Sequence, residues 1–125
     1  MSFIEQIWIV DDDSSIRWVM EKALAAADIS NTSFESPLDL LEALKTDSPD
    51  VIVSDIRMPE MDGMEATVEI RKFKSKDELP IVALTANVLQ EEVIHYKKIG
   101  MNDHIGKPFE RSMGIFAQGD IQAAG

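Results

Sequence analysis

The chain has 125 residues, 45% of them hydrophobic and 28% charged, which is the composition of one soluble globular domain. Its 23 acidic and 12 basic residues give a net charge of −11, which disfavours direct binding to nucleic acid or anionic lipid and suits a cation or a basic partner. No apolar run approaches the roughly 18 residues of a membrane span, the N-terminus lacks a signal-peptide pattern and there is no cysteine, so we expect a cytoplasmic protein.

Strands and helices alternate from the start of the chain. Residues 3–10 end in a continuous apolar run that is typical of a strand buried on both faces, and residues 16–27 carry apolar side chains at helical spacing. Residues 30–35 predict a weaker strand. Ser36 and Pro37 then have the pattern of a helix N-cap and first helical position.

The same alternation continues to residue 106. Residues 50–55 and 79–86 predict two strong strands, separated by a helix whose start is flanked by Asp62 and Glu65. A second helix spans residues 88–100 and ends at a glycine. A short strand at 103–106 follows.

The last segment, residues 110–125, is the weakest part of the pattern. Its apolar residues fit a helical stripe, but two interior glycines would each cost about 1 kcal/mol in a helix. We expect a single domain over 1–125, with 110–125 as a weak final helix. Strands alternating with helices predict an α/β fold, a flavodoxin-like doubly wound sheet of five parallel strands in the order 2-1-3-4-5.

Polar residues follow the strands of this predicted sheet at one edge. Asp11 and Asp12 close the first strand, Asp55 the third, Thr85 the fourth, and Lys107 follows the fifth. Ligands bind at this edge of such sheets, where the strand order reverses. Oxygen ligands without Cys or His specify Mg²⁺, and a carboxylate beside Mg²⁺, an ammonium and a hydroxyl suits phosphoryl transfer.

At these positions the chain resembles the receiver (CheY-like) domain of two-component response regulators. The matching motifs are "VDDD" at 10–13, "SDIRMPEMDG" at 54–63, "ALTA" at 83–86 and "GKPF" at 106–109, and the resemblance is strongest over 5–109. It implies a phosphoacceptor signalling domain rather than an enzyme. A histidine kinase or a phosphotransfer domain would supply the phosphoryl group, and the downstream target is a protein that the sequence does not name.

The resemblance also assigns roles to single residues. Asp55 would be the phosphoacceptor and a metal ligand, Asp12 a direct ligand and Asp11 a ligand through water, and the backbone carbonyl of Arg57 would complete the set. Thr85 and Lys107 would contact the phosphoryl group, and the peptide bond between Lys107 and Pro108 would be cis. Thr85 and His104 would be the two residues that change position on phosphorylation. The usual residue at the position of His104 is Tyr or Phe.

Asp13 has a different expected role from the two acids before it. Beside Ser14 it has the pattern of a helix N-cap or first-turn acid rather than a metal ligand. An alternative uses it differently: in a haloacid-dehalogenase-type, Mg²⁺-dependent phosphatase, Asp11 and Asp13 would form the reactive Asp-x-Asp pair. That alternative leaves Asp55 and the residues after it unexplained.

The two halves of the chain resemble different receivers. The first half is similar to nitrogen-regulation receivers, and the second to receivers of hybrid kinases, so a recombined or engineered chain is a further hypothesis. In that case the fold could survive only as a binding scaffold that is not phosphorylated. Because no output segment follows residue 109, the expectation is a stand-alone receiver or a fragment of a longer protein.

Overall fold

The computed structural model describes residues 5–56, 61–85 and 90–106. These residues form one parallel sheet in the order β2-β1-β3-β4-β5, as the sequence predicts. The strands are β1 (Gln6–Val10), β2 (Ser30–Phe34), β3 (Val51–Asp55), β4 (Ile81–Thr85) and β5 (Asp103–Gly106). The helices described are α1 (Ser14–Ala26), α2 (Pro37–Ala43), α3 (Gly63–Arg71) and α4 (Gln90–Lys98).

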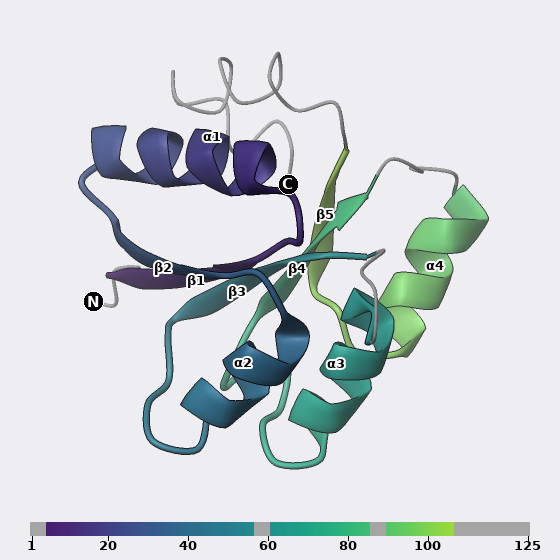
Figure 1. The fold of residues 1–125 in the computed structure, drawn as a ribbon. Coiled ribbons are helices and arrows are strands. Elements are labelled where there is room, and N and C mark those ends of the chain that lie inside the picture. Colours follow the sequence, from purple (N-terminus) through teal and green to yellow (C-terminus); the bar gives the residue numbers. More distant parts are fainter. Residues whose placement is uncertain (1–4, 57–60, 86–89, 107–125) are drawn as a thin grey trace.

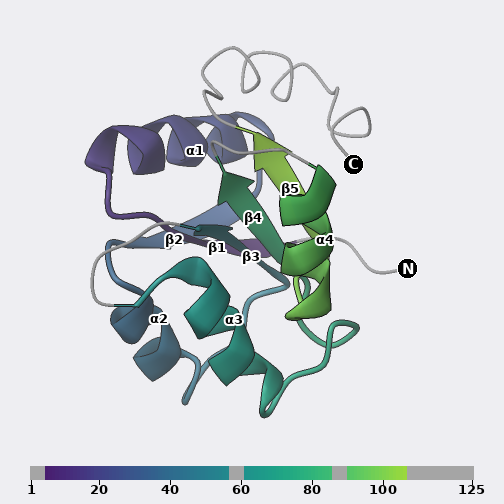
Figure 2. The same ribbon diagram turned by 90° about the vertical axis from the view of Figure 1, so that its right-hand side faces the viewer.

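Helices cover both faces of the sheet, so the predicted α/β layering is confirmed. Helix α1 lies on one face, and α2 and α3 lie on the other (Figure 1). Helix α4 stands beside β4 and β5, as the rotated view in Figure 2 shows. Strand β2 is an edge strand with no fully buried residue, which explains its weak apolar pattern.

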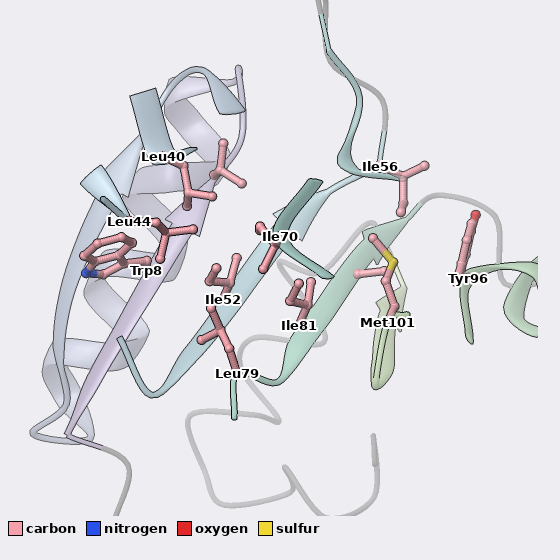
Figure 3. Close-up of a cluster of buried hydrophobic side chains, with 12 residues drawn as sticks. Trp8, Leu40, Leu44, Ile52, Ile56, Ile70, Leu79, Ile81, Tyr96 and Met101 are labelled. Carbon is pink, nitrogen blue, oxygen red and sulfur yellow. The ribbon is translucent and has the colours of Figure 1, made fainter. Parts of the chain in front are cut away.

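Alternate residues of each strand supply two separate hydrophobic clusters. On the α1 face, Ile9 and Val53 pack with Met20 and Leu24. The cluster on the opposite face joins the sheet to α2, α3 and α4 (Figure 3). Its buried members are Trp8, Val10, Leu40, Leu44, Ile52, Ile56, Ile70, Leu79, Ile81, Ala83, Tyr96 and Met101.

The predicted helix ends have the expected caps. The Ser36 side chain accepts from the Leu38 N–H at the start of α2, and Asp62 with Glu65 forms a capping box at the start of α3. Helix α4 is followed by Gly100 at φ 115°, a conformation that L side chains rarely adopt. The N–H groups that follow α4 donate back to its last turn as a Schellman motif, Gly100 to Lys97 and Met101 to Tyr96.

Several predicted segments extend one or two residues beyond the observed elements. Strand β1 begins at Gln6 within the described residues, β4 begins after Pro80, and α4 ends at Lys98, before the end of the predicted segment 88–100. Within the described residues, β3 starts one position later than predicted. The expected final helix at 110–125 lies outside the described residues.

No helix found in 5–56, 61–85 or 90–106 has the length and hydropathy needed to cross a membrane.

Candidate functional site

The strand register places two of the predicted acids side by side. Val10 of β1 pairs with Ser54 of β3, so the next residues, Asp11 and Asp55, stand in neighbouring positions at the carboxyl ends of these strands. Carboxylate oxygens of Asp11, Asp12 and Asp55 all lie within 4.8 Å of one another. The structure thus brings residues more than forty positions apart into one acidic cluster, as the sequence predicts.

The three acids differ in exposure. Asp11 is completely buried and Asp55 is 5% exposed, whereas Asp12 is exposed. Buried carboxylates at this spacing repel one another and lose hydration, so a cation that joins them lowers the electrostatic cost. A ligand reaching the cluster therefore meets Asp12 at the surface and the other two acids beneath it.

Asp13 has the separate role that the sequence predicts. Its carboxylate accepts from the Ser15 N–H at 2.8 Å and the Ile16 N–H at 3.4 Å, and it is the N-cap of α1. Its own backbone N–H donates to Asp11 Oδ1 at 2.9 Å. Asp13 caps the helix with its side chain and orients Asp11 with its backbone, which counts against an Asp11-x-Asp13 reactive pair.

Arg17 adds a base that the sequence reasoning missed. Its guanidinium donates to the backbone carbonyl of Asp11 at 2.7 Å and lies 3.9 Å from the Glu35 carboxylate. Helical spacing places residue 17 near the start of α1, but the contact with the preceding loop depends on the path of that loop. Arg17 thus fixes the acidic loop and adds positive charge beside it.

Gly63 explains why α3 can begin so close to the site. A Cβ at this position would lie 2.1 Å from the backbone oxygen of Asp55, so only glycine fits without a shift of the backbone. The Gly63 N–H donates to the Ile56 carbonyl at 3.0 Å, and the Ser54 hydroxyl donates to the Asp55 carbonyl at 3.0 Å. These two hydrogen bonds hold the backbone carbonyls of Asp55 and Ile56.

Thr85 ends the strand next to Asp55. Asp55 pairs with Leu84, so Thr85 stands one position further along β4, and it pairs with Gly106 of β5. Its side chain is 4% exposed, and its hydroxyl oxygen lies 3.1 Å from the hydroxyl oxygen of Tyr96 in α4. Sequence reasoning did not single out Tyr96, because its apolar spacing indicates only a core position.

The remaining predicted residues are placed only in part. His104 lies on β5, paired with Ala83. Its Nδ1 is a buried atom that has no hydrogen-bond partner among the described residues, and it lies 3.7 Å from Asp103 Oδ1. Arg57, Lys107 and Pro108 lie outside the described residues, and so does the predicted cis peptide.

The acidic cluster fits a small hard cation. Its donors are carboxylate oxygens, and octahedral Mg²⁺ holds oxygens at about 2.0–2.1 Å, so opposite ligands are about 4 Å apart. The 4.8 Å spread of the cluster is close to that requirement, and the exposed Asp12 shows that water or substrate oxygens can approach from solvent. Asp11, Asp12 and Asp55 therefore form an acidic site of the type that binds Mg²⁺.

Comparison with known proteins gives one consistent result. The family described as the response regulator receiver domain matches residues 7–115. The DNA-binding transcriptional regulator NtrC of Escherichia coli K12 is 43% identical over 104 residues, which are 83% of this chain and 22% of that protein. NtrC of Klebsiella pneumoniae is 46% identical over 103 residues, 82% of this chain and 22% of that protein. The chain thus spans less than a quarter of these relatives.

Solved structures agree with this match. The chemotaxis response regulator CheY4 of Vibrio cholerae has a TM-score of 0.83 and 25% identity, covering 98% of this chain and 99% of that one. The receiver domain of a sensor histidine kinase from Pseudomonas aeruginosa has a TM-score of 0.76 and 32% identity, covering 93% and 96%. In that structure a magnesium ion is coordinated in the active-site cleft.

A recombined origin gains no support from these matches. One relative, NtrC of E. coli, matches over 104 residues, 83% of the chain, which is too long a stretch to lie within either half alone. The similarity of short motifs to different receivers is therefore not enough to support a recombined chain.

Proposed function

We propose, from the premise that this chain belongs to the response regulator receiver family, that Asp55 is the residue that accepts the phosphoryl group. A receiver domain of two-component signalling is a phosphoacceptor module rather than an enzyme, and the acidic site of Asp11, Asp12 and Asp55 serves Mg²⁺ binding and phosphorylation.

The observation that carries the assignment is the position of Asp55 within the cluster. It ends the central strand β3, with Asp11 and Asp12 on one side and the strand that ends at Thr85 on the other. A phosphoryl group on its carboxylate would thus lie between the acids, which suit a cation, and the end of β4, where the Thr85 hydroxyl could turn toward it and donate. Asp12 as a direct ligand, Asp11 through water and the Arg57 carbonyl complete the proposed metal set.

The proposed reaction is a nucleophilic displacement at phosphorus. A carboxylate oxygen of Asp55 attacks the phosphorus of a phosphohistidine, the P–N bond breaks, and the imidazole keeps the electron pair and takes a proton from water. Bound Mg²⁺ would supply charge neutralisation for the phosphoryl oxygens and carboxylates. Thr85 and Lys107 are the proposed donors to the phosphoryl oxygens, with Lys107–Pro108 in the cis form.

Membership of the family implies a cognate histidine kinase as partner. We propose that this kinase, or a phosphotransfer domain charged by one, donates the phosphoryl group in the cytoplasm. Phosphorylation would then change the β4–β5 surface through Thr85 and His104 and alter binding to a downstream protein. Transcriptional regulation is the activity of the NtrC relatives, and this chain covers only 22% of the E. coli protein.

The test is intact-mass analysis after incubation with acetyl phosphate and Mg²⁺. The wild-type chain should gain the mass of one phosphoryl group, because Asp55 is the carboxylate placed to attack. Asp55→Asn should gain none, since an amide is a poor nucleophile, and EDTA should prevent the gain in the wild type. Asp77→Asn, an exposed acid far along the chain, is the matched control and should behave as the wild type.

Two results would contradict the proposal. If Asp55→Asn is still phosphorylated and Asp11→Asn is not, the acceptor is in the first acidic block, as in the phosphatase alternative. If the folded wild type gains no mass with Mg²⁺ present, the chain is a binding scaffold rather than a phosphoacceptor.

A further inference from the structure

A buried hydrogen bond connects the acidic site to helix α4. The hydroxyl oxygens of Thr85 and Tyr96 are 3.1 Å apart, and the two side chains are 4% and 3% exposed. Tyr96 lies on the α4 side of the large hydrophobic cluster, and its hydroxyl group points toward the end of the cluster where Ile56 lies (Figure 3). Ile56 directly follows Asp55, so the bond lies at the same edge of the sheet as the acids.

Strand alternation separates the Thr85 side chain from that of Asp55. In β3, Val53 faces the α1 side, and Asp55, two positions on, has the same parity. In β4, Ile81 and Ala83 face the opposite side, and Thr85 shares their parity. The observed bond with Tyr96 agrees with this placement, since Tyr96 belongs to the same cluster.

We propose that Tyr96 is a positioning residue that holds the Thr85 hydroxyl on the α4 side, in competition with a phosphoryl group on Asp55. This inference rests on the proposed function, in which Thr85 donates to that group. Whichever of the two hydroxyls donates in this pair, the Thr85 side chain would have to swing over the end of β4 to reach the phosphoryl oxygens. The bond with Tyr96 and the bond with the phosphoryl group then belong to two different conformations.

The burial of Tyr96 connects this competition to the position of α4. When Thr85 leaves, the Tyr96 hydroxyl loses its partner in a place where few waters can replace it, which is unfavourable unless the helix shifts. Phosphorylation at Asp55 would therefore be felt at α4 through one hydroxyl pair. The same linkage runs in reverse, so whatever weakens the pair should favour the phosphorylated conformation.

The test is the affinity for beryllofluoride, which binds a carboxylate in place of a phosphoryl group, measured with Mg²⁺ by NMR titration. Tyr96→Phe removes only the hydroxyl and should bind about 2- to 10-fold more tightly than the wild type, the range of one net hydrogen bond. In a Thr85→Val background the same change should have no effect. Ile94→Ala, an exposed neighbour on α4, is the matched control and should leave the affinity unchanged.

Equal or weaker binding by Tyr96→Phe would overturn the inference, and so would the same tightening in the Thr85→Val background. Amide spectra establish that each variant is folded, and Tyr96→Met, which also lacks the hydroxyl, replaces the Phe variant if that one is not. A wild type that neither binds beryllofluoride nor gains mass with acetyl phosphate would contradict the proposed function instead.

Discussion

Asp50 is a residue outside the acidic site whose charge contributes to the fold. Its Oδ2 accepts from the backbone N–H groups of Glu5 at 2.8 Å and Gln6 at 2.9 Å, just where β1 begins. These two hydrogen bonds, from Glu5 first, lower the pKa of Asp50 below its ordinary value. The ionised form is therefore favoured by folding, and its contribution to stability is present above the pKa of the unfolded chain.

We predict that Asp50→Asn lowers the free energy of unfolding at neutral pH by less than about 1 kcal/mol, because the group is exposed and screened. The difference from the wild type should shrink as the pH falls through the lowered pKa of Asp50, where the wild type loses its charge. Urea unfolding between neutral and acidic pH measures it, with Asp77→Asn as the control. A difference that does not change with pH would show that the charge has no part in it.

The roles of single acids were predictable from the sequence where the partners are local. Asp13 caps a helix that begins at the next residue, so its neighbours alone indicate its role. The Asp11–Asp55 pairing followed from strand order, because parallel strands end at a common edge. Arg17 and Tyr96 were not predictable, since each contact depends on the rotation of a helix and the path of a loop.

At the scale of elements, the Arg71 side chain connects helix α3 to two loop segments. The guanidinium of Arg71, in the last turn of α3, donates to the carbonyls of Leu79 at 2.9 Å and Gly100 at 2.8 Å, and to Asn102 Oδ1 at 3.0 Å. It also reaches the carbonyls of Lys74 and Ser75. Arg71 thus connects α3, the segment before β4 and the turn between α4 and β5.

We predict that Arg71→Lys lowers the free energy of unfolding by about 2 kcal/mol, because an ammonium cannot reach acceptors that a planar guanidinium meets on two sides. Urea denaturation measures the change. Lys72→Ala, which removes an exposed partner of Glu69, is the control and should cost less than about 1 kcal/mol. Wild-type stability in Arg71→Lys would mean that water satisfies these carbonyls equally well.

Helix caps and buried strands were predictable because their signals occupy a few consecutive residues. Ser36, Asp62 and Gly100 each act at the helix end that the sequence indicates. Strand ends were less accurate, since apolar residues such as Leu79 are buried outside the strand as well as within it. The spacing of apolar residues in the sequence indicates which side chains are buried, whereas backbone hydrogen bonding determines where a strand begins.

For the whole molecule, repulsion among the carboxylates of the acidic site lowers the stability of the folded chain, and a bound cation offsets this effect. The chain carries a net charge of −11, and three of its carboxylates converge within 4.8 Å. A ligand that binds only the folded chain stabilises it in proportion to the logarithm of its concentration, by about 2.7 kcal/mol at a hundred times Kd. Stability and site occupancy are therefore coupled through the same carboxylates.

Asp12→Asn should separate the two effects, because Asp12 is the exposed acid of the cluster and its loss leaves the core unchanged. Without Mg²⁺ we predict a variant more stable than the wild type by up to about 1 kcal/mol, since one like charge is gone. As Mg²⁺ is added at constant ionic strength, the wild type should gain stability and the variant little, so that their order reverses.

Urea unfolding at a series of MgCl₂ concentrations measures both curves, with Asp77→Asn expected to follow the wild type. The reversal distinguishes a ligand role for Asp12 from a general effect of net charge, because Asp77→Asn changes the net charge equally. Parallel curves for Asp12→Asn and the wild type would show that Mg²⁺ stabilises the chain without Asp12. The metal would then be held by the two buried acids, and Asp12 would affect the site only through its negative charge at the surface.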